Sequence, residues 1–173
     1  MERLEIEKSV RRALDMLFAR DDALLRRGGA EWSIAHRLAV YLEESFPSWN
    51  VDCEFNRQGR DDDKKRTSTG DLVRPDIIVH HRTRVEKEHN LLVIELKYAA
   101  SARDSEKACE YTAPPTGERK FQYQFGLTVL LGAVPALTWF EGGEESNAAR
   151  LLAKPAAPPD ASRRPLRVRR SRG

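Results

Sequence analysis

Two short apolar runs, each with charged residues at one end, constrain the fold of this chain more than any other feature. Residues 91–96 read LLVIEL, and Glu95 and Lys97 stand two positions apart at the end of this run. An apolar run of this length predicts a buried strand, and the two-residue period of a strand puts both charged side chains on one face, about 6.6 Å apart. Buried charges are costly unless they are compensated, so we expect a functional site here.

Asp76 stands at the start of the preceding apolar run, Ile77–Val79, directly after Pro75. If the two runs pair as a hairpin, Asp76 approaches Glu95, and the two carboxylates repel each other. A divalent cation removes that repulsion, and hard oxygen ligands suit Mg²⁺, with Mn²⁺ as a substitute, rather than zinc. Lys97 is then expected to hold an attacking water or to stabilise the charge that develops on a phosphate.

The rest of the chain predicts an α/β domain with a mixed central sheet flanked by helices. Helical spacing of apolar residues predicts helices over 1–20 and 30–45, and Glu31 falls on the apolar stripe of the second. We expect an outer strand over 51–55, in which Val51, Cys53 and Phe55 share one side, and a long polar loop over 56–74. Further helices are predicted over 104–112 and 117–125, followed by strands over 127–132 and 133–140.

Charge and composition separate a body from a tail. Residues 150–173 hold eight Lys or Arg and one Asp, a charge of +7, whereas the other residues hold 22 Lys or Arg and 26 Asp or Glu, a charge of −4. We therefore expect a single domain over 1–145 and a basic, Pro-rich, disordered tail over 146–173. The tail is interpreted either as an electrostatic arm for nucleic acid or as a solvated terminus.

Cellular location is predicted from what the chain lacks. Cys53 and Cys109 are far apart and follow no disulfide or zinc pattern, which suits a reducing cytoplasm. The first residues, MERLEIEKSVRRAL, contain no uninterrupted apolar core, which argues against a signal peptide, a membrane span or a membrane partner.

The segments RPDIIVHHR and NLLVIELK resemble the motifs of the PD-(D/E)XK nuclease superfamily, and the chain is similar to small, stand-alone bacterial members of it. The resemblance implies a restriction endonuclease-like αβββαβ core, here with an extra N-terminal helix. Asp76 matches the aspartate of the first motif, and Glu95 and Lys97 match the second.

The resemblance also implies a ligand set. Leu96 falls at the residue whose backbone carbonyl completes the metal shell, and Glu31 matches an acidic residue supplied by the helix before the sheet. Gln124 is the candidate for an auxiliary polar residue on the later helix; the alternative is an ordinary exposed glutamine.

The function implied is that of a metal-dependent nuclease that hydrolyses phosphodiester bonds, with Mg²⁺ as cofactor and DNA as partner. Two alternatives stay open. The chain is a nuclease-fold module that binds nucleic acid or protein without cleavage, or it is the nuclease component of a larger system. In the second case a protein partner supplies specificity, because the sequence shows no helix-turn-helix or zinc finger.

Overall fold

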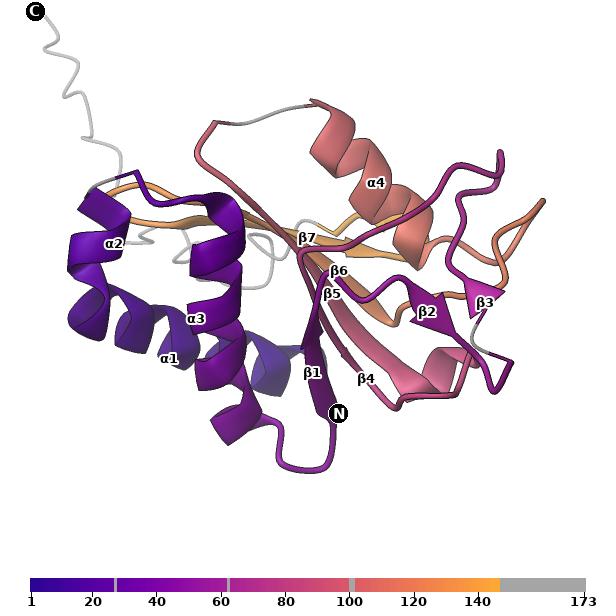
Figure 1. Ribbon diagram of the computed structural model, residues 1–173, viewed down its shortest axis with the longest axis horizontal. Coiled ribbons are helices and arrows are strands. Elements are labelled where there is room, and N and C mark those ends of the chain that lie inside the picture. The colour runs from indigo at the N-terminus through magenta and orange to yellow at the C-terminus, as the bar shows by residue number, and fades with distance from the viewer. Residues whose placement is uncertain (27, 62, 100–101, 147–173) are drawn as a thin grey trace, which may run out of the picture.

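The computed structural model describes residues 1–26, 28–61, 63–99 and 102–146, and over these residues a mixed sheet lies between helices (Figure 1). The sheet has six strands in the order β1-β4-β5-β6-β7-β8. Their bounds are β1 Asn50–Cys53, β4 Ile77–His80, β5 Asn90–Lys97, β6 Phe125–Leu130, β7 Ala136–Glu141 and β8 Glu144–Glu145. The predicted α/β class with a mixed, helix-flanked sheet is confirmed.

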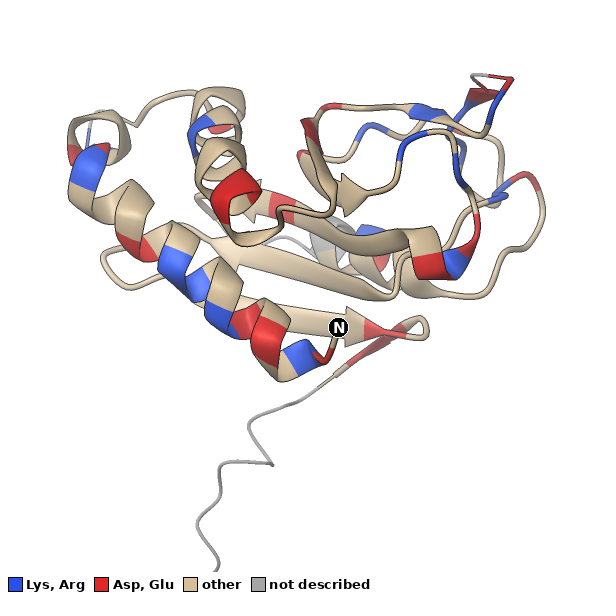
Figure 2. Cartoon of the chain, turned by 90° about the horizontal axis from the view of Figure 1, so that it is seen from below, with Lys and Arg blue, Asp and Glu red and all other residues tan. Residues whose placement is uncertain are grey.

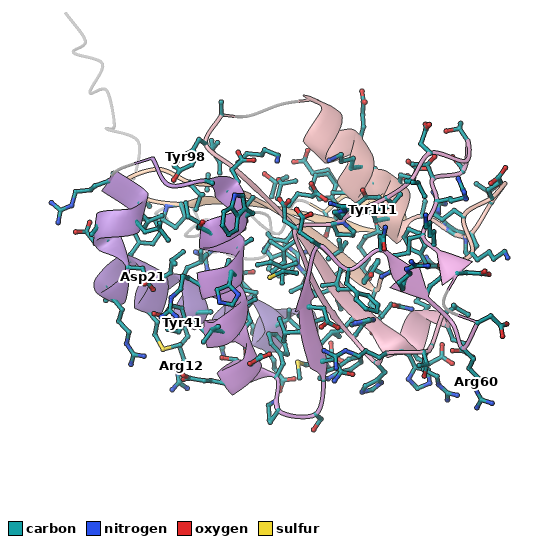
Figure 3. The ribbon with its side chains drawn as sticks, viewed as in Figure 1. Arg12, Asp21, Tyr41, Arg60, Tyr98 and Tyr111 are labelled. Carbon is teal, nitrogen blue, oxygen red and sulfur yellow. The ribbon has the colours of Figure 1, made fainter. Side chains whose placement is uncertain are left out.

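Helices cover both faces of the sheet (Figure 1). On one side lie α1 Arg3–Arg20 and α3 Glu31–Ser45, joined by the short α2 Asp22–Arg26, and on the other lies α4 Ala102–Thr112. Asp21, which ends α1, accepts hydrogen bonds from Arg37 and Tyr41 of α3 and so ties the two helices together (Figure 3). The predicted N-terminal helix is therefore packed against the helix that carries Glu31.

Strand periodicity divides the core between the two faces. Ile77, Val79 and Leu92, together with Ile94 and Leu96, pack against α1 and α3. Ile78 and Val93, which alternate with them along the strands, point the other way. They form a second apolar cluster beside α4 with residues from other segments, namely Val73, Tyr111, Phe121 and Tyr123. The long strands accordingly carry few charged residues, while most basic residues (blue) and acidic residues (red) lie on helices and loops (Figure 2).

Strand pairing agrees with the predicted hairpin. β4 pairs antiparallel with β5, with Ile77 opposite Ile94, and β5 then pairs parallel with β6 through the α4 crossover. β1 is an edge strand, as expected for residues 51–55. Glu54 adopts a φ of 54°, however, and this left-handed turn sends Phe55 to the α4 side, away from the core that Val51 and Cys53 contact.

Two other predictions differ from the structure. The polar segment 56–74 contains a short hairpin of β2 Arg57–Gln58 and β3 Asp63–Lys64, and its later part is fixed to α4 by the Glu110 carboxylate, which accepts hydrogen bonds from the Ser68 backbone and hydroxyl. The helix predicted over 117–125 is wrong. Phe121, Tyr123 and Phe125 are buried at every second position, which is the pattern of an extended chain, and Pro114 and Pro115 end α4 before it.

The predicted tail falls outside the described residues from 147 onward. Within the described part of the chain, none of the helices has the length and apolar character that a membrane crossing requires.

Candidate functional site

The hairpin of β4 and β5 brings the two predicted carboxylates together. Asp76 directly precedes β4, and because Ile77 pairs with Ile94, Asp76 lies across from Glu95 on the face that α4 covers. Pro75 before it restricts the backbone of Arg74 to extended conformations, which leads the chain into the strand. One carboxylate oxygen of Asp76, Oδ2, accepts a hydrogen bond of 2.7 Å from the backbone N–H of Leu96. The side chain thus binds the neighbouring strand just beyond the paired region.

Glu95 is the most deeply buried acid of this cluster, with 2% of its side chain exposed. Its Oε2 lies 3.2 Å from the Lys107 ammonium of α4, whereas its Oε1 has no hydrogen-bond partner among the described residues. The pKa of Glu95 is raised from 4.5 to about 7, mainly by burial and also by the nearby Asp76, while Lys107 and Lys97 act to lower it. A buried carboxylate oxygen without a donor is costly, and it is a ready ligand for a cation.

Lys97 links the strand to the helix on the other side of the sheet. Its ammonium lies 3.0 Å from Glu31 Oε2 and 3.9 Å from Asp76 Oδ2. Glu31 is the first residue of α3, where the positive end of the helix dipole favours a carboxylate. Burial also raises the pKa of Asp76, while the Leu96 N–H and Lys97 act to lower it. Lys97 is therefore held between two carboxylates that come from different elements.

The cluster contains three carboxylates, Glu31, Asp76 and Glu95, and two ammonium groups, Lys97 and Lys107. Among the described residues, no three side chains of His, Cys, Asp or Glu are grouped closely enough to hold a metal ion by themselves. Asp76 and Glu95 alone satisfy the usual protein share of a Mg²⁺ site, because Mg²⁺ takes one or two carboxylates and fills its shell with water and substrate phosphate. The arrangement fits Mg²⁺ with Asp76 and Glu95 as ligands. The ligand role of the Leu96 carbonyl stays a prediction.

Of the remaining predicted site residues, Glu31 lies at the cluster and Gln124 does not. Glu31 reaches the cluster, but its Oε2 is engaged by Lys97. Gln124 does not reach it. Its backbone N–H donates to Asn90 at the first residue of β5, and its side-chain amide donates to the Glu88 carbonyl. Glu95 lies five residues further along β5, about 16 Å away. Because residues 117–124 form a turn and an extended segment rather than a helix, the auxiliary role expected for Gln124 has no geometric support.

The polar residue that reaches the cluster from a later helix is Lys107 of α4, and not Gln124. A signal for it exists in the sequence, because Lys107 stands four residues before Tyr111 and next to Ala108, both of which are buried against the sheet. The same reasoning that placed Glu31 on an apolar stripe applies to Lys107.

A second polar cluster lies about 13 Å along β4 from Asp76. His80 Nε2 lies 2.8 Å from Asp52, which also binds Arg82, so Asp52 is enclosed between two basic side chains. Lys65 is buried nearby, donates to the Phe55 carbonyl at 3.2 Å and lies over the Phe55 ring. Burial lowers its pKa from 10.5 to about 7. No predicted site residue contacts this cluster.

The chain was compared with models of known protein families, with curated proteins and with solved structures. The chain matches no model of a known protein family, no curated protein and no solved structure.

Proposed function

We propose that the protein is a metal-dependent nuclease that hydrolyses phosphodiester bonds in DNA, with Mg²⁺ held by Asp76, Glu95 and the Leu96 carbonyl. One observation carries the proposal. Glu95 is buried at the end of an apolar strand beside a second carboxylate, and its Oε1 lacks a partner among the described residues. Such an arrangement lowers the stability of the fold, and a bound divalent cation would offset that cost.

The order of elements supports the same reading. When the separate β2–β3 hairpin and the short 3-10 turn before β5 are set aside, α3, β1, β4, β5, α4 and β6 come in the order of one helix, three strands, a helix and a strand. This order is compatible with the αβββαβ core that the resemblance to PD-(D/E)XK nucleases implies, and it supports the proposal. Asp76 directly precedes β4 and Glu95 lies on β5, the two strands that carry the motifs on which the resemblance rests.

The chain's own residues have distinct tasks in this proposal. Bound Mg²⁺ would supply charge neutralisation at the scissile phosphate and a lowered pKa for a coordinated water. Lys97, with its ammonium between Glu31 and Asp76, is placed to orient the attacking water and to stabilise the charge that develops on the phosphate. Glu31 positions Lys97 through their 3.0 Å ion pair. Lys107 balances the charge of Glu95 from α4 and favours its ionised form.

One observation favours a second candidate, a module that binds nucleic acid without cutting it. Each of two carboxylates of the cluster, Glu31 and Glu95, already has a lysine at 3.0 to 3.2 Å. Ion pairs of this kind compensate buried charge without a metal. A binding module would keep its affinity for DNA after neutralisation of Glu95, whereas the nuclease would lose turnover.

The test is a cleavage assay with supercoiled, linear and single-stranded DNA in Mg²⁺, Mn²⁺ or EDTA. Wild-type protein is compared with Glu95→Gln, which keeps the shape of the side chain, and with Glu141→Gln, which removes an exposed carboxylate from β7 of the same sheet. We expect cleavage that requires metal, disappears in Glu95→Gln and persists in Glu141→Gln. DNA that stays intact with wild-type protein at high concentration in Mn²⁺ would refute cleavage by the isolated chain.

A further inference from the structure

Two exposed aromatic side chains flank the lysine of the proposed nuclease site. Trp32 is 67% exposed and directly follows Glu31, and Tyr98 is 39% exposed and directly follows Lys97. Since Glu31 and Lys97 are joined by a 3.0 Å ion pair, the two aromatic residues border the same point of the molecule. An indole left in solvent contributes nothing to the core. Its position beside the cluster therefore suggests a role in contacting a ligand.

Tyr98 is held in place by the same region of the fold. Its hydroxyl donates a 3.1 Å hydrogen bond to the Gly29 carbonyl, two residues before Glu31. Figure 3 shows Tyr98 at the end of the molecule where α2 and the first turn of α3 lie. The ring is thus fixed relative to α3 as well as to β5.

Tyr98 also lines a pocket of about 410 Å³. Its walls are mainly apolar and come from α1, α2 and the segment after β6, with Phe18, Leu25 and Leu131 among the lining residues. Arg26 also lines it, paired with Asp22, and 78% of the Arg26 side chain is exposed. A volume of this size falls within the range of about 300–1,000 Å³ that is typical of small-ligand sites. The pocket therefore combines an aromatic wall with a solvent-exposed cation.

We propose that Trp32, Tyr98 and this pocket bind unpaired nucleobases of the substrate, so that the nuclease acts on single-stranded DNA or on unpaired ends rather than on continuous duplex. This inference rests on the proposed function. Stacking needs a free π face, which a base offers when it has left the duplex. Lys97 and Tyr98 are consecutive, so a phosphate held at Lys97 leaves the attached base within reach of the Tyr98 ring.

Charge explains why a nucleotide suits this place better than an apolar protein segment. Tyr98, which lines the pocket, directly follows Lys97 of the cluster, and Arg26 adds a guanidinium to the pocket wall. An exposed Arg–Asp pair contributes little stability, so Arg26 can turn to a phosphate at small cost. A nucleotide provides both the flat apolar ring and the anion that these groups fit.

The experiment measures binding without cleavage. A fluorescein-labelled oligothymidine and a labelled hairpin duplex are titrated in EDTA with the Glu95→Gln protein, alone and combined with Trp32→Ala, Tyr98→Ala or Tyr98→Phe. We expect tighter binding of the single strand than of the duplex, and a loss of at least about fivefold in single-strand affinity for each alanine variant. Tyr98→Phe keeps the ring and should keep the affinity.

Trp32 also provides an optical signal, because Trp139 is buried and Trp49 is stacked on His81. Oligothymidine should quench the intrinsic fluorescence, and Trp32→Phe should abolish that quenching. Equal affinity for duplex and single strand, or unchanged single-strand affinity in both alanine variants, would overturn the inference while leaving metal-dependent cleavage intact. Conversely, ring-dependent binding of the single strand by a wild-type protein that cuts nothing would support this surface and refute the nuclease.

Discussion

Replacing Glu95 by glutamine should stabilise the protein, and the gain should depend on pH. The pKa of Glu95 is about 7 in the folded protein and 4.5 as its ordinary value. Below pH 4.5 the Glu95 carboxyl is protonated in both the folded and the unfolded protein, so its ionisation does not reduce the free energy of unfolding. As the pH rises from 4.5 to 7 the unfolded chain loses its proton first, so the wild type loses stability. At about 1.4 kcal/mol per pH unit, the full cost above pH 7 is about 3 kcal/mol.

Glutamine carries no charge to desolvate, so Glu95→Gln should escape this loss. Its former partner Lys107 is 33% exposed and can be hydrated instead. We expect the free energy of unfolding of the variant minus that of the wild type to increase by about 3 kcal/mol between pH 4.5 and pH 8. Urea denaturation in EDTA at several pH values, followed by circular dichroism, measures this difference. A difference that stays constant over that range would refute the argument that burial of an ionised Glu95 is costly.

Adding Mg²⁺ to the same denaturation experiment tests whether Asp76 and Glu95 bind the metal. If Asp76 and Glu95 bind Mg²⁺, adding it at 100 times its dissociation constant should stabilise the wild type by about 2.7 kcal/mol at pH 8. The Glu95→Gln protein should gain much less, because one of its two carboxylate ligands is absent. Equal gains in both proteins would mean that Mg²⁺ acts elsewhere on the surface.

Three further predictions concern Lys107, Lys65 and Gly126. Lys107 lowers the pKa of Glu95, so Lys107→Met should move the acidic limb of the cleavage rate to higher pH; an unmoved limb would argue against Glu95 as the titrating group. Lys65→Met should raise the free energy of unfolding at pH 7 by up to about 5 kcal/mol, because burial lowers the Lys65 pKa from 10.5 to about 7. The buried ammonium destabilises the wild type below pH 10.5, and this loss of stability reaches its full size below pH 7. Exposed Lys64→Met should change stability by less than about 0.5 kcal/mol in the same denaturation experiment. Gly126→Ala should destabilise by about 1–3 kcal/mol in urea, because its Cβ would lie 3.0 Å from Thr112 and 3.2 Å from the Ala108 carbonyl of α4; an unchanged midpoint would show that α4 can shift.

Sequence patterns were sufficient where a long apolar run or a helical stripe set the structure. The runs around Ile78 and Val93 are too apolar to lie anywhere but inside the sheet, and their pairing puts Asp76 opposite Glu95. Glu31 was found because its side chain interrupts an otherwise apolar helical face. Lys107 has the same signature, yet its short helix has few apolar residues to define a stripe.

The features that sequence patterns did not predict depend on contacts between distant segments. Residues 119–123 are extended, and the turn at Gly117 and Glu118 before them lies against the loop that leads to Asp76. The Glu118 N–H donates to the Ser68 carbonyl, which a side chain at Gly117 would meet at 2.2 Å. Asp52 is enclosed because His80 and Arg82 reach it from β4 and the following turn. Neither partner is near in sequence, so periodicity carries no information about them.

Both edges of the sheet bear acidic residues, and this has a consequence for self-association. At one edge β1 is followed by the exposed Glu54, and at the other the ends of β7 and β8 carry Glu141, Glu144 and Glu145; acidic residues are red in Figure 2. A second copy that tried to continue the ladder edge to edge would bring like charges together, and β8 offers it two residues of backbone. Fibre-like growth through the sheet is thereby disfavoured at neutral pH. Acidification, which removes these charges, should weaken that protection.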